Sequence, residues 1–476
     1  MTAAPRVVVV GGGITGLALA FSLQADAQRR GASVALRVFD AAPRPGGHVQ
    51  TTRADGFLIE AGPNGFLNRE PHTLALVEAL GLGPRLVEAR PDAKRRFIVR
   101  EGRLCQVPHG PLSLFTTTAL SWPGRLRVLA EPFIGRPPAG IDETVHAFAT
   151  RRIGREAADM LVDTAVSGIS AGDSRRLSVR AQFPQMAEME REHGSLVRAM
   201  FARRGQRTGP SKLLSFDQGL GLLATTLAAR LGAVVQGHAS VRAIDRIGAI
   251  WRVTLETGEM VEAEHVVLAV SARAAAPMVR RLDPGLAATL DAVEYSGLGV
   301  VALGYRTADV PRALDGYGYL VTKPEGLATL GVVWESSLFP GRAADGTALL
   351  RVFLGGARRP EVVDMAPQDL VDLARAELAT VMGIAAEPRH VSVFRWPHAI
   401  AQYTVGHDER RAAIRHQVQR HPGLHVCGTS YDGVSFNHAV KSGRIMAHDL
   451  ADMVWDGARP RAAVTAPAHS PAPVLP

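Results

Sequence analysis

The sequence predicts a mixed α/β fold of the α+β type. One domain holds a parallel sheet, a helical domain is inserted into it, and a further domain is built on a mostly antiparallel sheet. Three observations favour this arrangement. The chain opens with an apolar strand that runs into a glycine-rich turn and a helix, at 7–27. Residues 112–205 show helical apolar periodicity. Residues 298–355 contain four short alternating or apolar runs, which indicate antiparallel strands.

The N-terminal turn is the most informative motif. Four valines lead into Gly11-x-Gly13-x-x-Gly16. In a Rossmann-like unit the first glycine allows a tight turn, the second lets the backbone approach a pyrophosphate, and the third lets the helix pack close to the strand. The following helix, 17–27, directs its free N–H groups toward the anion. The turn therefore predicts a dinucleotide site.

The next strand, 34–40, ends in Asp40, whose carboxylate is placed to bind the ribose hydroxyls of the dinucleotide. Arg44-x-Gly46-Gly47 follows at once and offers a cation and bare backbone to a phosphate and a flavin edge. A nicotinamide dehydrogenase does not require this element. The pair of motifs therefore favours a flavin dinucleotide.

Further along the chain, helices are expected at 144–152, 156–166 and 183–203, with a loop at 167–173. A late strand at 425–428 enters a glycine turn and then a helix at 437–452. The remaining predicted elements are a helix at 219–231, strands at 241–244, 251–256, 265–270 and 391–396, and a helix at 362–382.

Composition excludes several classes of protein. The net charge is +9, but only four of the 54 basic residues are lysines, so we interpret the excess of arginine partly as codon bias. No nucleic-acid module is visible, and nucleic acid is not an expected partner. Two cysteines fit a reducing compartment, and no His/Cys spacing predicts a metal site. No apolar stretch is long enough to span a bilayer, and the first strand leaves no room for a signal peptide, so the expected location is cytoplasmic.

Together, the N-terminal glycines, Asp40 and Arg44-x-Gly46-Gly47 resemble the amine-oxidase-like flavoprotein superfamily. The resemblance implies an FAD-binding Rossmann-like domain. In that superfamily a late strand, glycine turn and helix return to the FAD, as Gly428 to Phe436 would here. The cofactor-binding residues expected are Gly11, Gly12, Gly13, Ile14, Thr15, Gly16, Asp40, Ala41, Arg44, Gly47, Gly62, Pro63, Asn64, Gly65, Val241, Trp396, Gly428, Val434, Ser435 and Phe436.

Five segments narrow the resemblance, which extends to about residue 455. Residues 60–66, 94–97, 167–173, 335–340 and 394–397 look like oxygen-dependent protoporphyrinogen oxidases of the bacterial type. That family binds FAD non-covalently. The resemblance implies oxidation of protoporphyrinogen IX in three two-electron steps, each sending a hydride from a bridge carbon to flavin N5, with molecular oxygen as the final acceptor and hydrogen peroxide as its product. No side chain is assigned a catalytic role, because the flavin carries the chemistry.

The resemblance also implies a division of the chain into three parts. The expected segments are 1–85, 208–296 and 406–456 for the FAD-binding domain, 86–110 and 297–405 for the substrate domain, 111–207 for a helical domain able to face a membrane, and 457–476 for a disordered tail.

The substrate-binding residues implied by the resemblance are Arg96, Gly168, Leu320, Phe339 and Asn64. Arg96 matches an arginine that pairs with a porphyrin propionate, and a guanidinium suits a carboxylate because it can bind it bidentately. Neighbouring Arg95 could be the partner instead. Leu320 and Phe339 match residues on either side of the tetrapyrrole, and Gly168 matches a position where a side chain would intrude.

Two positions depart from the family pattern. Thr429 stands where the family usually has asparagine, and His438 where it has an acid. These changes leave open a flavin-binding protein without turnover. Two further activities stay open as well: oxidation of coproporphyrinogen III to coproporphyrin III, and the reaction of another oxidoreductase of the superfamily, such as an amine oxidase or a carotenoid desaturase. Peripheral attachment to the inner face of the cell membrane and a homodimer also remain open.

Overall fold

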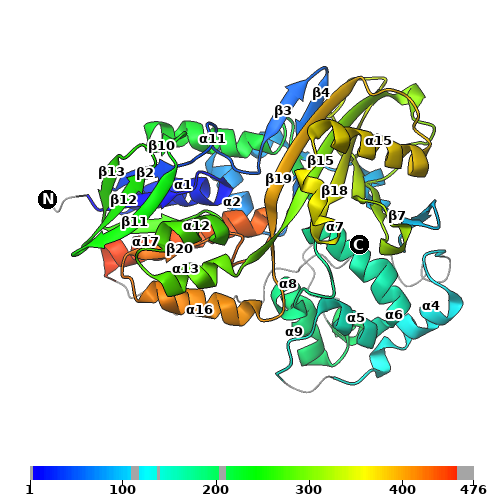
Figure 1. The fold of residues 1–476 in the computed structure, drawn as a ribbon, viewed down its shortest axis with the longest axis horizontal. Coiled ribbons are helices and arrows are strands. Elements are labelled where there is room, and N and C mark those ends of the chain that lie inside the picture. The colour runs from blue at the N-terminus through cyan, green and yellow to red at the C-terminus, as the bar shows by residue number, and fades with distance from the viewer. Residues whose placement is uncertain (1–3, 109–116, 137–139, 203–210, 458–476) are drawn as a thin grey trace.

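The computed structural model describes residues 4–108, 117–136, 140–202 and 211–457. Figure 1 shows a parallel sheet with its helices on the left, an antiparallel sheet at the upper right, and a group of short helices at the lower right. The predicted tail lies outside the described residues from 458 onward. The fold class is confirmed, whereas the domain boundaries stay a prediction.

The parallel sheet is assembled from both ends and the middle of the chain. Its order is β10-β2-β1-β14-β20, and all four pairings are parallel. The strands are β1 (Arg6–Val10), β2 (Ala35–Phe39), β10 (Val235–Gln236), β14 (His265–Leu268) and β20 (Leu424–Val426). Central strand β1 is buried on both faces, with Val7 and Val9 in one core cluster and Val8 and Val10 in another. This two-sided burial explains the unbroken run of valines.

Two layers cover this sheet. One layer consists of α1 (Ile14–Arg29), α2 (Pro71–Ala79), α11 (Gly221–Leu231) and α17 (Phe436–Asp456). The other consists of the sheet β11 (Val241–Ile247), β12 (Ile250–Leu255) and β13 (Met260–Ala263), with α12 (Ala272–Val279), α13 (Pro284–Asp291) and α16 (His407–Gln419). Strand β1 ends at Val10 between these two layers, and the first glycine turn follows it directly.

The second large sheet is mostly antiparallel, as predicted. Its order is β19-β15-β18-β17-β16-β7-β8, and β16 with β7 is the parallel pair. The strands are β7 (Phe97–Arg100), β8 (Arg103–Gln106), β15 (Glu294–Arg306), β16 (Gly318–Val321), β17 (Thr329–Trp334), β18 (Thr347–Gly355) and β19 (His390–Gln402). Helix α15 (Pro367–Met382) covers one face, and the predicted start of this helix at 362 was wrong because 360–364 form a separate 3₁₀ turn. Small sheets β3 (Thr51–Ala54) with β4 (Phe57–Glu60), and β5 (Phe66–Leu67) with β9 (Leu213–Phe216) and β6 (Leu86–Glu88), connect the two halves.

The inserted segment is helical but more broken than predicted. Its helices are α4 (Trp122–Leu129), α5 (Val145–Ile153), α6 (Arg155–Ala157), a π-helical turn (Ala158–Val162), α7 (Asp163–Ser170), α8 (Val179–Gln182), α9 (Pro184–His193) and α10 (Leu196–Ala202). The single helix expected at 183–203 is interrupted because Gly194 adopts a left-handed conformation, φ +72°, and ends α9. The loop expected at 167–173 was also wrong in its first half, since α7 continues to Ser170.

Within the described residues no helix is both long enough and apolar enough to cross a bilayer.

Candidate functional site

The N-terminal glycine turn has the geometry that a pyrophosphate requires. Gly11 has φ +107°, and a Cβ at Gly16 would collide with the carbonyl oxygen of Gly11, so the third glycine allows α1 to pack against the turn. Helix α1 has Gly13 as its N-cap, with no side-chain cap and no acidic residue in its first turn. The first N–H groups of α1 are therefore available to an anion. Ile14 and Thr15, which begin the helix, are buried.

The second glycine pair packs directly on the first turn. The N–H of Gly46 donates to the carbonyl oxygen of Gly12 at 2.8 Å, and a Cβ on Gly47 would lie 3.2 Å from the Cα of Gly13. The carboxylate of Asp40 accepts the N–H of Gly12 at 2.6 Å and the N–H of Ala42 at 2.7 Å. Burial raises the pKa of Asp40. The two motifs, predicted separately, thus form one backbone cradle, while Ala41 and Arg44 are exposed at its rim.

The C-terminal turn reaches the same cradle. A Cβ on Gly428 would lie 3.6 Å from the side chain of Thr15, and Gly443 of α17 lies directly against the Thr15 carbonyl oxygen. The hydroxyl of Ser435 caps α17 by accepting the N–H of His438 at 3.2 Å. Val434 precedes this cap, and Phe436 stacks on Phe66 with ring centroids 5.6 Å apart. The last helix therefore begins beside the segment that carries Gly65.

The segment Gly62 to Gly65 is fixed by partners far away in the sequence. A Cβ on Gly62 would collide with the carbonyl oxygen of His48, and Pro63 follows it. The amide of Asn64 donates to Glu335 at 3.2 Å. Trp396 donates from Nε1 to the carbonyl oxygen of Ala61 at 2.8 Å and lies edge-on to His48. Val241, by contrast, is a buried core residue of β11.

Sequence reasoning did not single out the buried ion pair that supports this segment. Glu335, at the start of α14 (Glu335–Leu338), lies 2.7 Å from Arg351 of β18, and both side chains are buried. Arg351 also donates to the carbonyl oxygen of Glu60 at 2.8 Å. The signal available was weak: Glu335 opens one of the segments that resembled the family, but nothing marked Arg351 as its partner.

Four of the predicted substrate residues make three separate contacts, and only one of these contacts joins two of them. The methyl groups of Leu320 would be 2.6 and 2.8 Å from a Cβ on Gly168, so the two residues touch. The buried ring of Phe339 would be 3.2 Å from a Cβ on Gly65, which brings Phe339 to the edge of the cofactor segment. The guanidinium of Arg96 lies 4.9 Å from the ring centroid of Tyr317, which packs in the same apolar cluster as Phe339.

Arg96 has an unusual environment for an arginine. Its Nε is buried without a hydrogen-bond partner, and no carboxylate of the described residues pairs with its guanidinium. Burial lowers the pKa of Arg96. Arg95, the other candidate for pairing with a propionate, forms an ion pair with Asp315 at 2.6 Å. The charge of Arg96 is therefore the one that a carboxylate of a ligand could neutralise.

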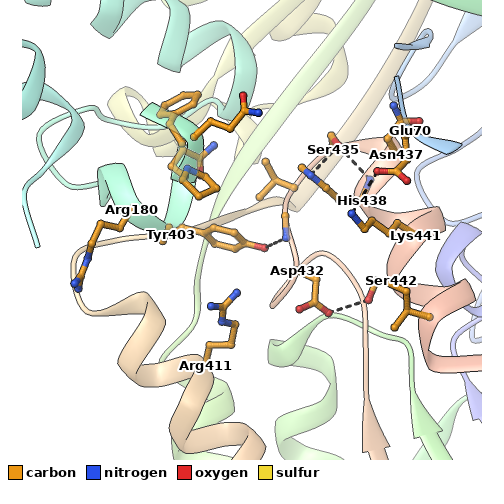
Figure 2. A pocket seen from close by; sticks show the side chains of 18 of the residues that line it. Glu70, Arg180, Tyr403, Arg411, Asp432, Ser435, Asn437, His438, Lys441 and Ser442 are labelled. Carbon is orange, nitrogen blue, oxygen red and sulfur yellow. Dashed lines mark hydrogen bonds and ion pairs between the residues drawn. The ribbon is translucent and has the colours of Figure 1, made fainter. Parts of the chain in front are cut away.

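A cavity of about 1800 Å³ lies between α8 and α9 of the helical segment and α16 and α17 of the parallel-sheet half. Of the predicted site residues, Gly65, Val434, Ser435 and Phe436 line it. Figure 2 shows Ser435 and His438 on one wall and Arg411 and Arg180 on another. The cavity adjoins the start of α17, and its volume far exceeds that of a single side chain.

The two departures from the family pattern have clear places in the structure. Thr429 contributes its backbone carbonyl oxygen, which accepts the hydroxyl of Tyr403 at 2.8 Å. His438 packs over Gly433, and its Nδ1 lies 2.9 Å from the hydroxyl of Ser435. Burial lowers the pKa of His438. An imidazole whose lowered pKa favours the neutral form thus occupies the position where the resemblance predicts an acid.

The parallel sheet, the uncapped α1 and the stacked glycine turns define a dinucleotide-binding α/β protein, and the cradle fits FAD because both of its glycine motifs leave bare backbone against α1. A family model described as flavin-containing amine oxidoreductase matches residues 14–451. The chain therefore belongs to the flavin-containing amine oxidoreductase family; it is an oxidoreductase, and its cofactor is FAD.

Individual relatives agree with this assignment. The chain is 29% identical to coproporphyrinogen III oxidase of Bacillus subtilis (strain 168), over 93% of this chain and 97% of that protein. It is 31% identical to protoporphyrinogen oxidase of Homo sapiens, over 92% and 96%. A solved structure from Exiguobacterium sp. 255-15, provisionally named as a protoporphyrinogen oxidase, matches with a TM-score of 0.81 and 26% identity, over 95% of this chain and 99% of that one.

Proposed function

We propose that the chain oxidises protoporphyrinogen IX to protoporphyrin IX in haem biosynthesis. The substrate would lose six electrons and six protons in three two-electron steps, and three molecules of oxygen would become three of hydrogen peroxide. FAD, held non-covalently by the glycine cradle, supplies the hydride-accepting chemistry when bound. The relatives from Homo sapiens and Nicotiana tabacum, both named protoporphyrinogen oxidase, support this substrate.

The observation that carries the proposal is the half-buried guanidinium of Arg96, whose Nε is buried without a hydrogen-bond partner and which pairs with no carboxylate of the described residues. A buried charge without a partner is costly, so its retention points to a ligand that supplies the opposite charge. Tyr317 packs against this guanidinium and belongs to the same apolar cluster as Phe339. Such apolar surroundings suit a large flat ring with few carboxylates. A propionate-bearing tetrapyrrole has both properties. In this proposal the residues named above for substrate and cofactor keep those roles, and the three-part division of the chain is kept as predicted.

Oxidation of coproporphyrinogen III is the second candidate, favoured by the Bacillus subtilis relative. The two substrates are distinguished by incubating purified, yellow protein with each porphyrinogen in parallel and following porphyrin fluorescence, oxygen uptake and peroxide. Faster turnover of protoporphyrinogen IX supports the first proposal, and faster turnover of coproporphyrinogen III replaces it with the second. No turnover of either contradicts both and favours a different oxidoreductase of the superfamily or a flavin protein without turnover.

We further propose that the helical segment attaches the protein to the inner face of the cell membrane. Helix α4 and the 3₁₀ turn after it expose a row of large apolar side chains, with Trp122 at 63%, Leu126 at 63% and Phe133 at 85% exposure. Trp122 and Leu126 are four residues apart and share one face of α4, and Phe133 ends the 3₁₀ turn Glu131–Phe133 that follows. Exposed apolar side chains of this kind are typical of helices that lie in a membrane interface. The homodimer stays a prediction, which sedimentation equilibrium of the holoprotein tests.

A further inference from the structure

Tyr403 lies where three parts of the fold meet. It follows β19 of the antiparallel sheet directly, and its backbone carbonyl oxygen accepts the N–H of Ser178, the N-cap of α8, at 2.8 Å. Its hydroxyl donates to the carbonyl oxygen of Thr429 at 2.8 Å and accepts the N–H of Gly433 at 2.7 Å. Figure 2 shows the phenol pointing at this turn. One residue, through its backbone and its side chain, therefore connects the helical segment and the sheet to the C-terminal glycine turn.

The surroundings of Tyr403 keep its hydroxyl in place. The ring is buried and stacks on the imidazole of His407, with centroids 3.9 Å apart and planes 14° apart. Burial raises the pKa of Tyr403, so its phenol stays protonated and can donate and accept at once. His407 is also buried, and burial lowers its pKa to about 3, so the stacked platform is uncharged.

Backbone hydrogen bonds close the first part of the turn held by Tyr403: the N–H groups of Tyr431 and Asp432 donate to the carbonyl oxygen of Gly428 at 3.1 and 3.2 Å. Gly433, Val434 and Ser435 follow this closed part. Gly428 and Gly433 have φ of +113° and +103°, which other residues adopt only with strain. The side chain of Asp432 is held by Arg415 at 2.6 Å and by Ser442 at 2.9 Å, but these contacts lie on the α16 and α17 side. The Tyr403 hydroxyl alone bridges Thr429 and Gly433 among the contacts of the described residues.

We propose that Tyr403 is a positioning residue that sets where Val434 and Ser435 are presented to the flavin. This rests on the proposed function, in which this turn faces the cofactor. Without the hydroxyl, one backbone N–H and one carbonyl oxygen lose their partner, and the turn gains freedom between its two glycines.

The test compares Tyr403→Phe with Tyr431→Phe. Tyr431 is an equally buried tyrosine on the same turn, but its hydroxyl has no hydrogen-bond partner among the described residues, so the second variant removes the same atom without the contact. The holoprotein readouts are the FAD dissociation constant, the flavin absorption spectrum and reduction potential, hydrogen exchange at 428–436, and melting temperature. For Tyr403→Phe we expect FAD to bind roughly 3- to 10-fold more weakly, exchange to accelerate about 10-fold and the potential to shift. Tyr431→Phe should match the parent.

Equal flavin properties in both variants would overturn the proposal. A lower melting temperature of Tyr403→Phe with an unchanged flavin spectrum and reduction potential would also overturn it, since this result would show that Tyr403 only stabilises the fold. If Tyr403→Phe does not fold, hydrogen exchange of the parent decides: slow exchange of the Gly433 amide supports the tie, and exchange at the rate of an open loop contradicts it. None of these readouts uses a porphyrinogen, so they remain separate from the substrate assays.

Discussion

Arg95 and Arg96 are neighbours in the sequence, yet their guanidinium groups have different surroundings. Arg95 is paired with Asp315, whereas Arg96 lies on the ring of Tyr317 with a buried, unpartnered Nε. The sequence could not separate them, because the partner is 220 positions away from Arg95. Only the folded chain shows which charge is free for a ligand.

We expect Arg96→Ala to raise KM for the porphyrinogen about 10- to 100-fold while FAD content stays unchanged. A charge-assisted hydrogen bond contributes about 1.5–3 kcal/mol, which corresponds to that range. Steady-state kinetics and flavin absorbance measure the two quantities. Arg95→Ala is the matched control and should change KM much less. An unaltered KM in Arg96→Ala would exclude the propionate role.

Residues recognisable from the sequence are mostly those that act through local backbone geometry. Gly11 and Gly16 could be assigned because strand, turn and helix are contiguous there, and Gly47 because its motif directly follows the next strand. Glu335 and Tyr403 were missed because their roles depend on contacts with Asn64 and Gly433, far away along the chain. Positions such as Val241 and Gly168 remain predictions, since their contacts in the structure are with other side chains.

At the scale of elements, the close approach of α1 and α17 determines how the cofactor cradle closes. Gly443 lies against the carbonyl oxygen of Thr15, and Gly428 against the Thr15 side chain. Helix α17 was predicted from its order after a late strand, and its bounds were roughly right. The close packing on α1 could not be predicted, because nothing in the local sequence distinguishes Gly443 from other helical glycines.

We expect Gly443→Ala to destabilise the protein, although alanine favours a helix by about 1 kcal/mol. The new methyl group would meet a backbone oxygen, which cannot rotate away, and overpacking of this kind costs about 1–3 kcal/mol. Thermal unfolding should show a melting temperature lower by a few degrees, with weaker FAD retention. Gly83→Ala, at a site open to solvent, is the control. A more stable Gly443→Ala would contradict the packing.

The helices of the inserted segment were the least predictable elements. Apolar periodicity favoured one helix over 183–203, but Gly194 divides it, and α7 extends past Gly168 into the expected loop. Glycine has a different structural role at each of the two positions. At Gly194 a positive φ ends a helix, whereas at Gly168 the missing side chain makes room for Leu320.

For the molecule as a whole, buried histidines connect pH to stability. Burial lowers the pKa of His407 to about 3, so below its unfolded value near 6.5 the unfolded chain binds a proton that the folded chain does not. The contribution of the neutral His407 to the free energy of unfolding is therefore fully present above about pH 6.5, and it falls as the pH drops toward 3. His425, whose pKa is also lowered to about 3 by burial, acts in the same direction.

We expect His407→Phe to reduce the stability loss between pH 7 and pH 5. The phenyl ring retains the stack on Tyr403 and removes one titrating group, which is worth at most about 2 kcal/mol over this interval. Urea unfolding at both pH values measures the difference. His416→Phe, an exposed position on the same helix, is the control. Identical pH dependence in His407→Phe and the parent would show that His407 does not stay neutral.

The exposed apolar side chains of α4 and the turn after it affect the whole molecule, because in the proposed function they attach the protein to a bilayer. We expect the variant Trp122→Ser, Leu126→Ser, Phe133→Ser to lose flotation with liposomes that contain anionic lipid, since full burial of each side chain contributes about 1.5–3 kcal/mol. Met260→Ser removes a 61% exposed apolar residue on β13 and should float as the parent does. Flotation of the triple variant at the level of the parent would contradict membrane attachment through this face.

The order of strands in the parallel sheet has a consequence for how the protein is made. Strands β1 and β2 leave the ribosome first, but β20 and α17 come from residues 424–456. Until those residues emerge, β14 is an open sheet edge and α1 lacks α17, one of the helices that pack against it. From the completion of β14 until β20 and α17 emerge, a nascent chain therefore exposes an unpaired strand edge and apolar helix surface that favour aggregation. Loss of β20 and α17 would leave the other four strands of the parallel sheet but remove the turn and the helix that close the cofactor cradle.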